Sequence, residues 1–188
     1  FNRIVDAAID TRNPRTAMRP IPAGRMTPMR AWMFTITFAA LFISGCAGFL
    51  ILDSNAWPIG LSLPTLASLA GYSYCKRFTT LSHFVLGAVI AFAPIATWLA
   101  VHPASLGWTA IFLAGAVLTW IAGFDLIYSC QDVEVDRAEG LFSIPAHFSI
   151  AFALGLSRVC HTLALTCLIA LGRVESSGWL YWIGVSMA

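Results

Sequence analysis

Long apolar runs in series constrain this chain more than any other feature of its sequence. Five such runs follow one another between short polar segments, over about 31–52, 59–75, 83–101, 108–130 and 149–171. A helix needs roughly 20 apolar residues to cross the hydrocarbon layer of a membrane. Backbone groups inside lipid must satisfy their own hydrogen bonds, and continuous runs of this length do so as helices. The sequence therefore predicts an all-α, polytopic transmembrane helical bundle in the lipid bilayer.

The composition supports one membrane domain over 1–188 and excludes other classes. Hydrophobic residues make up 59% of the chain and charged residues 11%, whereas soluble domains carry about 25% charged residues. The five cysteines are an odd number, which argues against a disulfide framework. Basic residues lie in loops and form no patch, so we expect no nucleic-acid partner. Because the chain opens at Phe1 on a polar motif and ends on a short apolar run, we expect truncation at both ends.

The loops between the runs differ sharply in charge. Loops 13–30, 76–82 and 131–147 fall on one side of the membrane and hold Arg15, Arg19, Arg25, Arg30, Lys76, Arg77 and Arg137. The loops on the other side are 53–58, 102–107 and 172–178. Arg173 is the one Lys or Arg residue in them. Cytoplasmic loops carry an excess of Lys and Arg. We therefore expect the first side to face the cytoplasm.

A first acidic cluster lies at the start of the chain, in the segment NRIVDAAID. Asn2, Asp6 and Asp10 recur every four residues, which places them on one face of a helix. Like charges at this spacing repel each other, and carboxylates at the mouth of a membrane helix are costly. A positive partner should offset this cost, although a solvated helix end is the alternative.

A second acidic cluster follows the fourth apolar run, in DLIYSCQDVEVD. Asp125, Asp132 and Asp136 are spaced by two turns and then one turn, so a continuous helix would place all three on one face. A salt bridge to an arginine would explain one of these carboxylates but not all three. The predicted topology puts both clusters at the same membrane face. Facing carboxylates without nitrogen or sulfur ligands favour Mg²⁺, which binds one or two carboxylates together with substrate phosphates.

Basic residues on the same side would complete a diphosphate site. Lys76 and Arg77 follow the second run, and Tyr72 lies one helical turn before Lys76. Arginine can grip two phosphate oxygens at once, and Arg15 and Arg19 have the same potential. The alternative is that these cations only orient the chain in the membrane. The histidines receive no role, and Arg158 inside the last run has none either.

These motifs resemble the UbiA family of membrane prenyltransferases. Residues 2–10 match its N(D/R)xxDxxxD motif, through Asn2, Arg3, Asp6 and Asp10, and residues 13–20 match its NPRTAxRP loop. Its YxxxKR segment corresponds to Tyr72, Lys76 and Arg77. Its second DxxxD motif corresponds to Asp132 and Asp136, with Asp125 upstream, and 137–148 match the RxxGxxSIPAxF tail.

The resemblance implies a fragment of a nine-helix fold and a Mg²⁺-dependent aromatic prenyltransferase of the bacterial inner membrane. It implies transfer of a polyprenyl group from a prenyl diphosphate to an aromatic acid. Within the family, the motifs are most similar to those of the 4-hydroxybenzoate polyprenyltransferases of ubiquinone synthesis, so the implied acceptor is 4-hydroxybenzoate. The metal ligands and catalytic residues would be Asp6, Asp10, Asp132 and Asp136, with Tyr72 beside the reacting carbon. Asn2, Arg15, Lys76, Arg77 and Asp125 would bind substrate. The alternatives are a menaquinone pathway, a CDP-alcohol phosphotransferase-like enzyme and a cation transporter.

Overall fold

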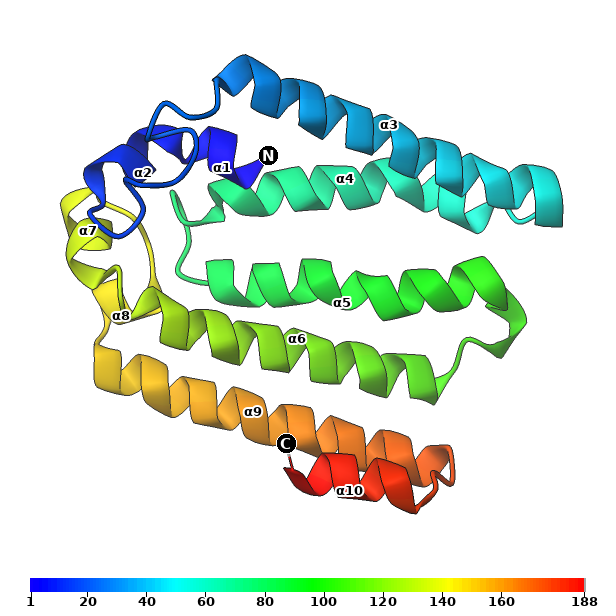
Figure 1. The fold of residues 1–188 in the computed structure, drawn as a ribbon. Coiled ribbons are helices and arrows are strands. Elements are labelled where there is room, and N and C mark those ends of the chain that lie inside the picture. The colour runs from blue at the N-terminus through cyan, green and yellow to red at the C-terminus, as the bar shows by residue number, and fades with distance from the viewer. Residues whose placement is uncertain (188) are drawn as a thin grey trace.

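A computed structural model describes residues 1–187, and every regular element in this range is a helix (Figure 1). The long helices are α3 (Pro28–Asp53), α4 (Trp57–Cys75), α5 (Ser82–Val101), α6 (Trp108–Ser129) and α9 (Ile150–Val174). The short ones are α1 (Asn2–Val5), α2 (Ala7–Arg12), η1 (Pro103–Ser105), α7 (Val133–Ala138), α8 (Ile144–His147) and α10 (Trp179–Met187). The all-α prediction is confirmed.

The long helices coincide with the five predicted runs, and their ends differ from the predicted ones by no more than three residues. Four of them, α3, α5, α6 and α9, are long and apolar enough to cross a membrane. The fifth, α4, is less apolar because Ser62, Pro64 and Ser73 interrupt its sequence. The chain is a multi-pass membrane protein.

Successive long helices lie side by side in the order α3, α4, α5, α6 and α9, each packed on its neighbour in the sequence (Figure 1). The closest packing joins α6 to α5 and α9, where small buried residues such as Ala122 and Ala153 allow the backbones to approach. A Cβ on Gly87 of α5 would collide with the Leu118 carbonyl oxygen of α6. Small residues therefore set the α5–α6–α9 spacing.

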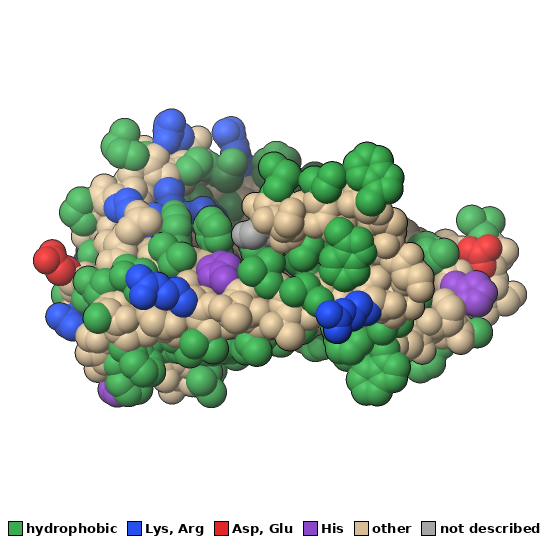
Figure 2. Space-filling model, turned by 90° about the horizontal axis from the view of Figure 1, so that it is seen from below, with side chains coloured by type: hydrophobic (Ala, Val, Ile, Leu, Met, Phe, Trp, Pro, Cys, Tyr) green, Lys and Arg blue, Asp and Glu red, His purple; other side chains and the backbone are tan. Residues whose placement is uncertain are grey.

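The outer surfaces are apolar, as a lipid environment requires. None of the residues of α3 is buried, and large side chains such as Phe34 and Phe38 are more than half exposed. Figure 2 shows hydrophobic side chains along the face that includes α9 and α10, with only scattered charged groups. This surface has the character of a helix bundle that contacts lipid.

All the predicted polar loops of the basic side meet at one end of the bundle (Figure 1). There, α1, α2 and loop 13–27 lie beside α7 and α8, next to the turn that follows α4. Hydroxyl caps begin two of the long helices that leave this end, α3 and α9. Thr27 accepts a hydrogen bond from the Arg30 amide at the start of α3, and Ser149 accepts one from the Phe152 amide at the start of α9.

Candidate functional site

A cavity of about 340 Å³ opens among the polar loops at this end of the bundle. It lies between the first acidic segment, the end of α4, the start of α5 and the segment from Asp125 to Leu141. Its lining contains all ten residues that the sequence assigned to the site: Asn2, Asp6, Asp10, Arg15, Tyr72, Lys76, Arg77, Asp125, Asp132 and Asp136. The structure thus brings together residues from four distant parts of the chain.

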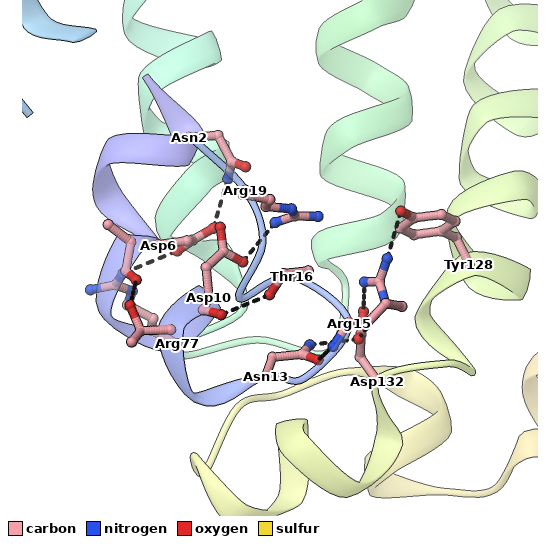
Figure 3. A network of polar contacts seen from close by, with 12 residues as sticks. Asn2, Asp6, Asp10, Asn13, Arg15, Thr16, Arg19, Arg77, Tyr128 and Asp132 are labelled. Atoms are coloured by element: carbon pink, nitrogen blue, oxygen red, sulfur yellow. Dashed lines mark hydrogen bonds and ion pairs between the residues drawn. The ribbon is translucent and has the colours of Figure 1, made fainter. Parts of the chain in front are cut away.

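In the first cluster, each aspartate is held by an arginine. Asn2 donates its side-chain amide to Asp6 Oδ2 at 2.9 Å, and Arg77 Nη2 lies 3.2 Å from Asp6 Oδ1. Arg19 Nη1 lies 2.6 Å from Asp10 Oδ1. Figure 3 shows these side chains converging from α1, α2, the following loop and the turn after α4. The predicted positive partners of the first cluster are therefore present.

In the second cluster, Asp132 is bound by residues of the loop that follows α2. Arg15 binds it with two nitrogens, Nε at 2.9 Å from Oδ1 and Nη2 at Oδ2, and Asn13 donates to Oδ1 at 2.7 Å. Arg15 also donates to the Tyr128 hydroxyl at 2.7 Å and lies over that ring (Figure 3). The loop after α2 therefore ties the two acidic clusters directly to each other.

Two helix predictions near the clusters need correction. The prediction that Asp125, Asp132 and Asp136 share one helical face is wrong, because α6 ends at Ser129 and α7 begins at Val133, so no continuous helix joins them. Tighter bonds replace the helical ladder there, from the Asp132 amide to the Ser129 carbonyl, for example. The first acidic helix is interrupted at Asp6, although the bonds from its amide to Asn2 and from the Asp10 amide to Asp6 persist.

The electrostatic environments of the carboxylates differ. Burial raises the pKa of Asp6, against the opposing effect of Arg77. Burial also raises the pKa of Asp136, although Ser143 and Lys76 act against it. Burial disfavours ionised Asp132 too, but the hydrogen bonds from Arg15 and Asn13 outweigh it, and its pKa lies below the usual value. Burial therefore disfavours the ionised forms of Asp6 and Asp136, whereas hydrogen bonds stabilise the ionised form of Asp132.

The donor set of the cavity fits a hard divalent cation. Asp10 Oδ2 and Asp136 Oδ2, one from each cluster, are buried and have no hydrogen-bond partner, which is unusual for buried carboxylates. Among the described residues, no three His, Cys, Asp or Glu side chains converge as a complete metal cage. Mg²⁺ does not need one, because it takes one or two carboxylates and completes its shell with water and phosphate.

The charges lining the cavity balance each other. Five carboxylates face five cations, which are Arg3, Arg15, Arg19, Lys76 and Arg77. Within residues 1–187, the Lys76 side chain forms no ion pair, whereas three of the arginines each hold an aspartate. An anionic ligand that entered with its own cations would find both kinds of partner here.

The sequence did not identify three residues of this network, Asn13, Tyr128 and His83. Asn13 lies in the NPRTAxRP loop, but the motif gave it no role, whereas Arg19 was named for its potential to grip phosphate without its partner Asp10. Tyr128 is the hydroxyl partner of Arg15. His83, which received no role, is fully buried, and its Nδ1 lies 2.7 Å from Asp125 Oδ2. Its position directly after Ser82 at the start of α5 gave no signal of that contact.

Comparisons with known proteins agree with this architecture. A 4-hydroxybenzoate octaprenyltransferase of Pseudomonas fluorescens strain Pf-5 is 32% identical over all of this chain and 61% of its own length. A polyprenyl transferase of an Arthrinium species is 28% identical over 97% of this chain and 58% of its own length. The chain therefore spans about three fifths of the curated relatives that it matches.

A solved structure gives the same result for the fold. The apo structure of a UbiA homolog from Aeropyrum pernix K1 superposes with a TM-score of 0.87 at 31% identity, over 99% of this chain and 68% of the other. The profile of the UbiA prenyltransferase family matches residues 1–188. Sequence, fold and relatives thus agree that the chain belongs to the UbiA prenyltransferase family.

Proposed function

We propose that this chain binds a prenyl diphosphate at the membrane surface and transfers its polyprenyl group to an aromatic acid, 4-hydroxybenzoate, in the synthesis of a quinone such as ubiquinone. The observation that carries the proposal is the cavity in which both acidic clusters and their cationic partners meet at one end of an apolar bundle. A substrate with a charged head and a long apolar tail suits such a boundary. The names of relatives at about 30% identity support the acceptor.

The metal sites follow from the two clusters. Asp6 and Asp10 would hold one Mg²⁺, and Asp132 and Asp136 would hold a second. The partnerless oxygens of Asp10 and Asp136 support this assignment, because a bound cation would satisfy both. When bound, the ions neutralise charge that develops on the diphosphate leaving group.

The arginines change partners when the diphosphate binds. In the structure, Arg15, Arg19 and Arg77 neutralise Asp132, Asp10 and Asp6. With metal ions held by these carboxylates, the guanidinium groups would be free to hold phosphate oxygens, for which their planar fork is well suited. Lys76 needs no such exchange, since its ammonium group forms no ion pair within the described residues. It therefore makes the first contact with the incoming diphosphate.

The remaining residues shape the reaction space. Asn2 orients Asp6 through its 2.9 Å hydrogen bond. Tyr72 and Leu86 line the cavity beside the diphosphate region, where an apolar and aromatic wall keeps water from the allylic carbon. The carbon–oxygen bond of the allylic diphosphate breaks, and the ring carbon next to the acceptor hydroxyl forms the new bond.

Transfer in membranes that contain the protein tests the proposal. Labelled geranyl diphosphate and 4-hydroxybenzoate are incubated with Mg²⁺ or with EDTA, and prenylated product is measured. We expect product with Mg²⁺ and none with EDTA. Transfer to a different aromatic acid, as in a menaquinone pathway, would keep the mechanism and change the acceptor. Failure to consume the diphosphate with any acceptor would refute the proposed function.

A further inference from the structure

Asp125 has a partner unlike those of the other carboxylates in the cavity. Asp6, Asp10 and Asp132 are each paired with an arginine, and Asp136 has an oxygen without a partner. Asp125 instead contacts the imidazole of His83, with Nδ1 2.7 Å from Oδ2. Asp125 lies on α6, before the break that separates this helix from the DxxxD segment.

The second nitrogen of His83 determines its tautomer. The backbone N–H of Ile144 donates to His83 Nε2 at 3.3 Å, so Nε2 acts as an acceptor and carries no proton. The ring proton then resides on Nδ1, which donates it to Asp125. A neutral imidazole thus presents a hydrogen bond to the carboxylate without the charge that an arginine would bring.

The surroundings hold this arrangement firmly. The His83 side chain is 0% exposed. Ile144, which supplies the amide, belongs to the buried core cluster together with Leu126, the residue after Asp125. Asp125 retains 22% side-chain exposure and lines the cavity. One end of the pair is therefore fixed in the protein core, while the other faces the space for substrate.

We propose that His83 is a positioning residue that holds Asp125 as the acceptor of the proton lost from the aromatic ring, an inference that rests on the proposed prenyl transfer. A carboxylate held by an arginine or a metal ion is a poor base, because a cation stabilises its ionised form. Asp125 avoids both, and the neutral imidazole fixes its direction. This separates the proton acceptor from the carboxylates that serve the diphosphate.

The allylic carbon–oxygen bond breaks, and its electron pair leaves with the diphosphate. The ring carbon next to the hydroxyl gives an electron pair to the allylic carbon, which leaves that ring carbon bearing both the prenyl group and its hydrogen. Asp125 takes this hydrogen as a proton, and the C–H electron pair restores the aromatic ring. His83 keeps its proton throughout.

The test compares Asp125→Asn, His83→Leu and His83→Gln with the unmutated protein in membranes. The acceptor is 4-hydroxybenzoate with hydrogen or deuterium at the two ring positions next to the hydroxyl. We expect kcat to fall about 100-fold or more in Asp125→Asn and about 10- to 100-fold in His83→Leu. Both should show a clear primary isotope effect because proton removal becomes limiting, while KM for the prenyl diphosphate stays unchanged.

The His83→Gln variant separates positioning from simple packing. A glutamine amide can donate to Asp125 and accept from the Ile144 amide, so it should restore kcat to within a few-fold and return the isotope effect toward that of the unmutated protein. If His83→Leu and His83→Gln both lose activity with an unchanged isotope effect and a raised KM for the diphosphate, His83 has only a structural role and the inference is wrong. Absence of product from the unmutated protein would instead refute the proposed function beneath it.

Discussion

The Arg19–Asp10 ion pair should oppose metal binding and support diphosphate binding, so Arg19→Gln should move the two affinities in opposite directions. Arg19 Nη1 lies 2.6 Å from Asp10 Oδ1, and the side chains are 24% and 8% exposed. A hydrogen bond between charged groups contributes about 1.5–3 kcal/mol, which partial exposure of Arg19 reduces to about 1–2 kcal/mol. Its loss leaves Asp10 free for a cation.

This energy converts into a measurable change in affinity. Since about 1.4 kcal/mol corresponds to a factor of ten, Mg²⁺ should bind the diphosphate-free variant roughly 5- to 30-fold more tightly. The prenyl diphosphate should bind roughly tenfold more weakly, because one charge-assisted hydrogen bond is lost. Metal binding can be followed with Mn²⁺ as a paramagnetic substitute, with the free ion counted by electron paramagnetic resonance. Displacement of a labelled prenyl diphosphate reports the second affinity.

A matched control is available outside the cavity. Arg12 forms an ion pair with Glu139 at 2.5 Å, but its side chain is 55% exposed and does not line the cavity. Arg12→Gln should leave both affinities unchanged. If Arg19→Gln weakens both ligands, or leaves metal binding unaltered, then Arg19 does not compete with the cation and the exchange of partners is refuted.

Three further changes test other parts of the structure. Burial raises the pKa of Asp136, so its ionised form destabilises the metal-free fold above that pKa. Asp136→Asn should raise the melting temperature in EDTA at pH 7, lose the gain seen on acidification and abolish transfer; a lower melting temperature would contradict this. Gly87→Ala should cost about 1–3 kcal/mol of stability through its collision with Leu118, measured by thermal unfolding in detergent, whereas Gly45→Ala, with open space around it, should cost none. Lys76→Ala should raise KM for the prenyl diphosphate about tenfold without changing metal-free stability, and an unchanged KM would remove Lys76 from the site.

The sequence was sufficient for the helices because each long run carries its own signal. Apolar length fixes a span, and Pro28 with Thr27 marks the start of α3. The end of α6 at Ser129 lies within one residue of the predicted end of the fourth run, but the short helix α7 was not predicted, because Val133–Ala138 lies in a segment expected to be a loop.

The contents of the cavity were predictable from charge and motif, but the pairing of its residues was not. Arg15 and Arg19 are four residues apart in one loop, yet Arg15 crosses to Asp132 while Arg19 returns to Asp10. The course of the intervening backbone decides this, and hydropathy carries no information about it. His83 was missed for a similar reason, because its partner lies 42 positions away on another helix.

If the proposed function is correct, the balance of charge in the cavity predicts that metal and diphosphate bind together. With five carboxylates and five cations in the lining, a metal ion alone adds uncompensated positive charge beside the arginines. A diphosphate alone adds negative charge beside the carboxylates. Bound together, the two nearly cancel, and each breaks the ion pairs that obstruct the other. By linkage, a coupling of this kind is reciprocal, so we expect each ligand to raise the affinity of the protein for the other by the same factor.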